Sequence, residues 1–163
     1  MNDLGWRKIG ILGGAFNPVH LGHLQMAEVA IAQLSLDLVI WIPTYRPPHK
    51  VDDLLAFEQR LEMVKRAIAP NPAFIASDIE QQRRSVSYAI STLHDLNQQY
   101  PNTQWYWLIG LDAFQSLPHW RESATVASQC IWLVAPRNDA KTHTICQHVA
   151  RELATQHVTL RWQ

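Results

Sequence analysis

Two histidines at helical spacing, His20 and His23, follow a Gly-Gly pair at 13–14. An apolar run at 9–12 precedes the glycines, and apolar residues recur at helical spacing over 21–34, so we predict a strand that turns into a helix. Such a turn leaves unpaired backbone N–H groups at the helix start, where the helix dipole adds partial positive charge. Two imidazoles and several amides that converge on one point suit a phosphoryl group that gains negative charge in a transition state.

The glycines of this segment would leave room for a phosphate. Gly13 and Gly14 have no Cβ, so the chain can turn sharply and a ligand can approach the backbone, and Gly22 keeps the surface low between the histidines. A Gly-Gly turn can also be only a tight connection, and a His-x-x-His pair can be a solvated helix end or part of a metal site. We favour phosphate binding because the strand, the turn, the histidine pair and the helix occur together.

The composition is that of an ordinary globular domain. The chain has 163 residues, of which 47% are hydrophobic and 17% are charged, and this is enough to bury a core as one domain. Its 14 basic and 14 acidic residues balance, which argues against nucleic acid or an anionic membrane as a partner. The first eight residues hold no apolar signal core, and no stretch has the length of a membrane span, so we expect a cytoplasmic protein.

Apolar runs alternate with helical patterns along the whole chain. Near-continuous apolar strands separated by helices indicate a parallel sheet covered on both faces, with ligands at the carboxyl ends of its strands. We therefore predict one α/β domain, Rossmann-like and doubly wound, with a mostly parallel sheet. The predicted strands are 9–12, 38–42, 74–77, 105–109, 131–135 and 158–160, and the predicted helices are 21–34, 57–69, 87–99, 120–127 and 144–156.

Candidate polar residues follow several predicted strands. Gly110 would let the chain turn at a strand end, and Asp112 is placed to accept from a hydroxyl, to face a metal or to cap a helix. Arg137 follows the next strand, where its guanidinium would either clamp a phosphate or remain exposed in a loop. We predict no metal site, and Cys130 and Cys146 have the spacing of neither a disulfide nor a metal site, so reduced thiols are expected.

The loop after the second predicted strand is basic and contains three prolines within 43–50. Lys50 would offer a mobile positive charge to a phosphate, although a rigid loop with solvated charges is the alternative. Within the helix at 57–69, the apolar stripe is interpreted as core and Arg60 as solvated. Ser87 is predicted to cap the helix that follows it.

The segment Gly13-Gly14-Ala15-Phe16-Asn17-Pro18-Val19-His20-Leu21-Gly22-His23 resembles the first signature of the nucleotidyltransferases that carry a His-x-Gly-His motif. Its flanks resemble the bacterial nicotinate-nucleotide adenylyltransferases most closely. The resemblance implies a Rossmann-like fold of the HUP type and transfer of the adenylyl group of ATP to nicotinate mononucleotide, which forms nicotinate adenine dinucleotide and pyrophosphate. It also implies that Mg²⁺ arrives with the ATP.

The resemblance further implies roles for individual residues. His20 and His23 would bind the phosphates being joined and the oxygen that leaves with pyrophosphate. The nicotinate nucleotide would be held by Lys50, Tyr88, Ala89 and Trp120, with the indole stacked on the nicotinate ring. Ala89 replaces a threonine of the family, so a hydroxyl donor is absent but the backbone N–H remains. The residues expected to contact ATP are Gly13, Gly14, Ala15, Phe16, Gly22, Gly110, Asp112 and Arg137.

A second family motif, Ser-Ser/Ala-Thr-x-x-Arg, is expected after the last strand but is not found, because the sequence ends at Leu160-Arg161-Trp162-Gln163. We therefore expect a single nucleotidyltransferase domain over 1–163 that lacks the family's C-terminal helical segment and holds the triphosphate weakly. The alternatives are a truncated or regulatory nucleotide-binding relative with little turnover, and the same chemistry on nicotinamide mononucleotide or a pantetheine phosphate. Trp120 and the Pro-Pro-His-Lys loop argue against pantetheine. The oligomeric state stays open.

Overall fold

A five-stranded parallel sheet forms the centre of the structure, a computed structural model that describes residues 7–49, 51–136 and 139–163. Every neighbouring pair of strands in this sheet is parallel, in the order β3-β2-β1-β4-β5. The strands are β1 (Arg7–Gly14), β2 (Leu38–Pro43), β3 (Phe74–Ala76), β4 (Thr103–Gly110) and β5 (Cys130–Ala135).

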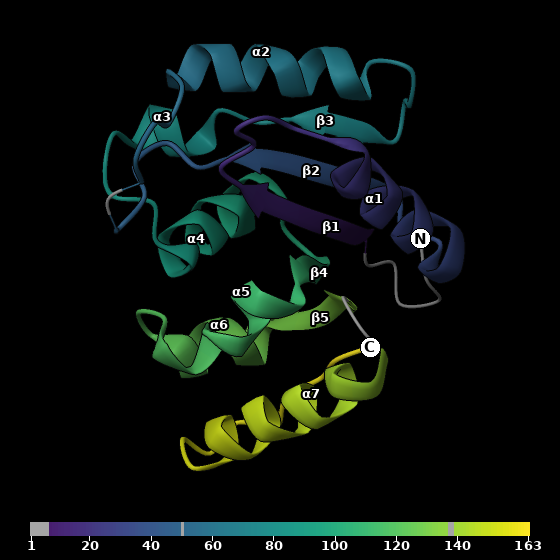
Figure 1. Cartoon of the computed structure of the whole chain (residues 1–163), viewed down its shortest axis with the longest axis vertical. Coiled ribbons are helices and arrows are strands. Elements are labelled where there is room, and N and C mark those ends of the chain that lie inside the picture. The colour runs from purple at the N-terminus through teal and green to yellow at the C-terminus, as the bar shows by residue number, and fades with distance from the viewer. Residues whose placement is uncertain (1–6, 50, 137–138) are drawn as a thin grey trace.

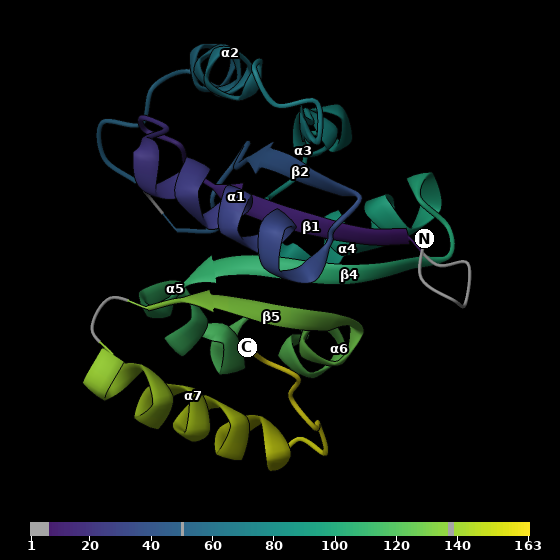
Figure 2. The ribbon, with the colours of Figure 1, turned by 90° about the vertical axis from the view of Figure 1, so that its right-hand side faces the viewer.

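Helices cover both faces of the sheet (Figure 1). In Figure 2, α1 lies in front of the sheet and α4 behind it. The helix α7 packs against α5 and α6 beside β5. The helices are α1 (Leu21–Leu34), α2 (Phe57–Ile68), α3 (Ile79–Arg83), α4 (Ala89–Gln99), α5 (Leu111–Gln115), α6 (Ser123–Gln129) and α7 (Asp139–Ala154), with a 3₁₀ helix, η1, at Leu117–His119.

The alternation of side chains along the strands builds two separate cores. In β1, Ile9 and Ile11 pack with Leu93 of α4, whereas Leu12 packs with Ala27 of α1 on the opposite face. Successive side chains of a strand point to opposite faces, so a strand buried on both faces must be apolar at nearly every position. This explains the continuous apolar runs and confirms the predicted α/β fold.

The strand order places the crevice of the fold beside β1. The chain leaves β1 through α1 toward β2 and β3, and then crosses through α3 and α4 to β4 on the other side of β1. The direction of winding therefore changes between β1 and β4, and ligands of doubly wound folds bind at such a point, beyond the carboxyl ends of the strands. Leu12 is in register with Leu108, so the turns after Gly14 and Gly110 lie side by side at one edge of the sheet.

One predicted strand is wrong. Residues 158–160 form no strand, because the preceding residues are used to close α7: the Val158 N–H donates to the Leu153 carbonyl, and His157 has a φ of 62°. The chain meets β5 only afterwards, through a parallel bridge between Trp132 and Trp162.

Three helix starts also differ from the prediction, and the first is that of α7, which begins at Asp139 rather than at 144. Trp120 ends η1 with extended backbone, so α6 begins at Ser123 rather than at 120. The helix α4 begins at Ala89 with Tyr88 at its N-cap, and Ser87 is not the cap because its hydroxyl accepts from the Arg46 N–H instead. No helix of the described residues is both long enough and apolar enough to cross a membrane.

Candidate active site

The turn between β1 and α1 is anchored by a buried aromatic ring. Phe16 has a φ of 47° and its side chain is 2% exposed. The ring packs against Trp41 of β2 at 5.6 Å and contacts the His23 ring edge-on at 5.0 Å between centroids. Because the ring is buried, a contact from Phe16 to a ligand would come from its backbone N–H, and the ring itself supports His23.

His20 and His23 form a stacked pair at the start of α1. Their ring centroids are 3.8 Å apart, with an angle of 24° between the planes. The His20 backbone N–H donates to Nδ1 of His23 at 3.2 Å. Since Nδ1 accepts this hydrogen bond, the proton of a neutral His23 ring is on Nε2, where it can be donated to a phosphate oxygen.

The charge of His23 is set by its surroundings. Burial, together with the nearby His20, lowers the pKa of His23 from 6.5 to about 4. His23 is therefore a neutral hydrogen-bond donor at physiological pH. Leu21 and Gly22 begin α1, so their N–H groups have no acceptor within the helix and add to the donors at this point.

Gly22 packs closely against the ring of His20. A Cβ at residue 22 would lie 3.1 Å from both Cε1 and Nδ1 of the His20 ring. A side chain there would require the His20 ring to shift by a few tenths of an ångström. The absence of a Cβ thus leaves the ring its present position next to residue 22.

The end of β4 faces open space next to this turn. Gly110 caps α5 with a φ of −73°, a conformation open to any residue, so the turn itself does not require glycine here. An added Cβ at Gly110 would meet nothing within 4 Å, so this position leaves room for a ligand. Asp112 is exposed in the first turn of α5.

The loop after β2 is held by three consecutive residues. The Thr44 N–H donates to the Gly14 carbonyl at 2.9 Å, and the Tyr45 N–H donates to Oε2 of buried Glu80 at 3.0 Å. Arg46 exchanges two hydrogen bonds with Ser87, one to the Ser87 hydroxyl and one from the Ser87 N–H. The loop therefore owes its order to these bonds as well as to its prolines, and it runs beside the start of α4.

The residues predicted to hold the nicotinate end come from two elements. The Ala89 N–H lies in the first turn of α4. Trp120 is half-buried: it packs edge-on against Trp107 and Trp132, and its Nε1–H donates to the Ser116 hydroxyl at 2.9 Å.

A cation–π contact connects these two elements. The guanidinium carbon of Arg121 lies 4.8 Å from the centre of the Tyr88 ring. The segment after η1 and the start of α4 are therefore neighbours. Lys50 and Arg137, the two remaining predicted contacts, lie outside the described residues.

Two residues hold the turn through hydrogen bonds that the sequence analysis did not predict. Arg60 is not solvated: its side chain is 1% exposed and its guanidinium donates to three backbone carbonyls. Helical spacing contained the signal, because Arg60 shares a buried face with Phe57 and Val64. Asn17 accepts from the Leu55 N–H and donates to the Asp53 carbonyl, each at 3.1 Å.

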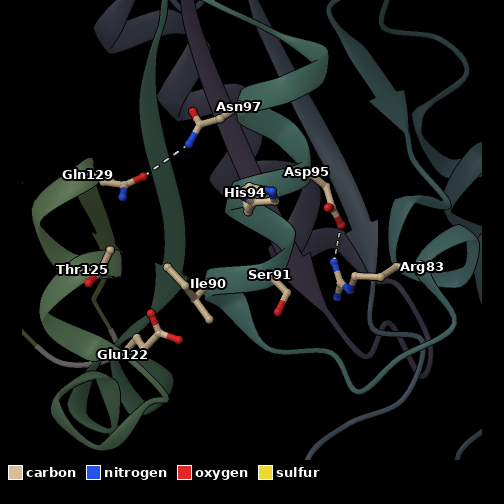
Figure 3. A pocket seen from close by; sticks show the side chains of 9 residues that line it. All are labelled: Arg83, Ile90, Ser91, His94, Asp95, Asn97, Glu122, Thr125 and Gln129. Atoms are coloured by element: carbon tan, nitrogen blue, oxygen red, sulfur yellow. Dashed lines mark hydrogen bonds and ion pairs between the residues drawn. The ribbon is translucent and has the colours of Figure 1, made fainter.

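A polar hollow of about 510 Å³ lies elsewhere, between α4 and α6 (Figure 3). An Arg83–Asp95 ion pair and an Asn97–Gln129 hydrogen bond flank it. None of the predicted site residues lines it. Within the described ranges, no group of three or more His, Cys, Asp or Glu side chains is arranged to hold a metal ion.

The chain is similar to known proteins in both sequence and fold. A family model described as cytidylyltransferase-like matches residues 11–157. A probable nicotinate-nucleotide adenylyltransferase of Trichormus variabilis is 46% identical, over 96% of this chain and 76% of the relative. One from a Synechococcus strain is 49% identical, over 92% of this chain and 75% of the relative.

Solved structures agree on the fold. The nicotinic acid mononucleotide adenylyltransferase of Plasmodium falciparum, in complex with NaAD, superimposes with a TM-score of 0.71 at 17% identity, over 85% of this chain and 71% of that one. The family model covers most of the residues, and the two relatives exceed 40% identity over nearly the whole chain. The chain therefore belongs to the nicotinate-nucleotide adenylyltransferases, within the cytidylyltransferase-like family.

Proposed function

We propose that this protein transfers the adenylyl group of ATP to nicotinate mononucleotide, with nicotinate adenine dinucleotide and pyrophosphate as products. The observation that carries the proposal is the stacked pair of His20 and His23 at the start of α1, beside the carboxyl ends of β1 and β4. Family membership supports the same reaction, because the relatives are named for it.

The reaction needs positioning and charge stabilisation more than proton transfer. A phosphate oxygen of the mononucleotide attacks the α-phosphorus of ATP in line, a new P–O bond forms, and the bond to the pyrophosphate oxygen breaks. The attacking phosphate is already anionic at neutral pH, so no general base is required. His23, neutral with its proton on Nε2, would donate a hydrogen bond to the oxygens that gain charge, together with His20 and the amides of the turn.

Magnesium enters this scheme with the substrate. The described residues form no cluster of three or more potential His, Cys, Asp or Glu ligands. MgATP is the expected substrate, in which phosphate oxygens and water supply the ligands and the ion neutralises phosphate charge.

The acceptor would lie between α4 and the segment after η1. The Ala89 N–H at the start of α4 would bind the nicotinate carboxylate, and the exposed part of Trp120 would stack on the ring beside Tyr88. We also propose Lys50 and Arg137 as contacts to phosphate, and Gly13, Gly14 and Gly110 as positions where the nucleotide approaches the backbone.

Pyrophosphate release from MgATP tests the function directly. We expect release with nicotinate mononucleotide as acceptor, and clearly less with nicotinamide mononucleotide or a pantetheine phosphate, because a helix N-terminus favours the anionic carboxylate. Equal rates with the acid and the amide would contradict the proposed acceptor. No release with any acceptor would instead favour a nucleotide-binding protein without turnover.

Replacement of His23 should remove most of the activity. We expect His23→Ala to lower kcat by about 10²-fold or more, because a donor to the developing charge is lost. The rate is expressed per folded molecule, with the folded fraction taken from urea unfolding. His94→Ala, at an exposed position of α4, is the matched control and should retain the wild-type rate. A His23→Ala rate equal to that of the control would contradict the assignment.

The depressed pKa of His23 predicts a specific sensitivity to acid. The pKa is about 4 in the folded protein and 6.5 in the unfolded chain, so between these values the unfolded state binds more protons. The contribution of His23 to stability is therefore complete above pH 6.5 and is lost as the pH falls toward 4. We compare the free energy of unfolding at pH 7.5 and 5.0 for wild type and His23→Asn, whose Oδ1 can still accept from His20. Wild type should lose more, and equal losses would contradict the pKa shift.

Trp120 should matter for one substrate only. We expect Trp120→Ala to raise the KM for nicotinate mononucleotide far more than the KM for ATP, because stacking on a pyridine ring contributes roughly 1 kcal/mol or more. Trp120→Phe keeps an aromatic face and should recover part of the affinity. Equal changes in both KM values would indicate that Trp120 acts only through its packing on Trp107 and Trp132.

A further inference from the structure

We propose that Arg60 is a positioning residue for the reaction, because its guanidinium sets the direction of a peptide group in the turn after β1 and of another in the loop after β2. The proposal rests on the function proposed above and adds to it a residue that lies on α2, within the protein interior. No substrate contact is assigned to Arg60.

Arg60 is buried, and its guanidinium is held in place by hydrogen bonds to the backbone. The side chain is 1% exposed, and its guanidinium carbon lies 5.6 Å from the centre of the Phe57 ring. Nη1 donates to the Ala15 carbonyl at 2.7 Å, Nη2 to the Thr44 carbonyl at 2.8 Å, and Nε to the Leu55 carbonyl at 2.9 Å. A buried charge is costly unless its donors are satisfied, and here three carbonyls, one from the turn after β1 and two from the loop between β2 and α2, must converge on one guanidinium to satisfy them.

Because a peptide group is planar, the direction of each of these carbonyls also fixes the direction of the N–H in the same peptide group. In a trans peptide the C=O and the following N–H point in opposite directions, and the cis bond among the described residues is at Asn17–Pro18. The peptide between Thr44 and Tyr45 shows the result: its carbonyl accepts from Arg60, and its N–H donates to Oε2 of Glu80 at 3.0 Å. That peptide is held between a cation and a carboxylate.

The peptide between Ala15 and Phe16 is held at its carbonyl end only. Its C=O accepts from Arg60, so the Phe16 N–H points away from Arg60, and no residue within the described ranges accepts a hydrogen bond from it. Phe16 has a φ of 47°, a conformation that non-glycine residues keep only when their surroundings impose it. Arg60 supplies such a constraint and leaves an oriented donor for a phosphate oxygen.

Asn17 connects the same two segments from the other side. Its amide spans the Asp53 carbonyl and the Leu55 N–H, while Arg60 holds the Leu55 carbonyl. The turn after β1 and the loop after β2 therefore cannot shift independently. If the first holds ATP and the second lies beside the acceptor, this connection maintains the separation that an in-line displacement needs.

Substitutions at Arg60 test this role. Arg60→Lys keeps the charge but cannot donate from a planar fork to three carbonyls, and Arg60→Ala removes the group. We expect kcat/KM for pyrophosphate release, expressed per folded molecule, to fall roughly 10- to 100-fold in both variants. Millimolar guanidinium should restore part of the rate of Arg60→Ala and leave Arg60→Lys unchanged. Arg66→Ala, an exposed position on the same helix that pairs with Glu62, should keep the wild-type rate with and without guanidinium.

Two kinetic results would overturn the proposal. One is a folded Arg60→Lys with the wild-type kcat/KM. The other is a loss in Arg60→Ala that the smaller folded fraction explains completely and that guanidinium does not reverse.

A binding measurement separates this proposal from the proposed function and does not require turnover. We expect MgATP to shift the amide resonance of Phe16 in the wild-type protein, and to shift it less in Arg60→Lys. An unchanged Phe16 resonance in wild type overturns the role of Arg60, whether or not the Arg60 variants fold. Absence of pyrophosphate release by wild type, with the Phe16 shift present, overturns the proposed reaction and leaves the positioning role supported.

Discussion

The parallel pairing of β1 with a strand on each side is the constraint on which the rest of the structure depends. Because β2 and β4 run in the same direction as β1, all three carboxyl ends arrive at one edge of the sheet. Gly14 is in register with Pro43, and Leu12 with Leu108. The turn with the two histidines, the loop after β2 and the start of α5 are thus brought together by backbone pairing, before any side chain of the site contributes.

At the proposed phosphate site, the described residues supply hydrogen-bond donors that carry no formal charge, in addition to the charged contacts proposed for Lys50 and Arg137. The chain carries as many acidic as basic residues, and His23 has a depressed pKa because it is partly buried against His20. What remains are oriented dipoles: Nε2 of His23, the first amides of α1 and the Phe16 N–H. Fixed dipoles lose little energy to reorganisation during a reaction, which suits a transition state whose negative charge grows on oxygen.

Two charged residues, Arg60 and Glu80, are buried next to the candidate site and orient backbone groups there. Arg60 and Glu80 hold the peptide between Thr44 and Tyr45 from opposite sides. Glu80 also accepts from the buried Thr92 hydroxyl at 2.7 Å, which links the loop to α4. These hydrogen bonds hold the loops in position, and each buried charge is satisfied by backbone or hydroxyl groups.

The sequence by itself determined the parallel α/β fold and the segment that builds the histidine pair. Strands buried on both faces must be apolar throughout, and a Gly-Gly turn before an amphipathic helix has a recognisable pattern, so five of the six predicted strands and the turn of 13–23 agree with the structure. Local structure was harder to predict from the sequence where a residue's hydrogen-bond partner is distant in the chain. Ser87, for example, bonds to Arg46 instead of capping α4. Residues 158–160 were also predicted wrongly, because they follow the turn that closes α7. Only the tertiary structure decided the role of Arg60, because its acceptors at Ala15, Thr44 and Leu55 are backbone carbonyls. Every residue has a backbone carbonyl, so the residue types in a sequence do not reveal which carbonyls accept hydrogen bonds from Arg60. These acceptors can be identified only once the segments are folded together.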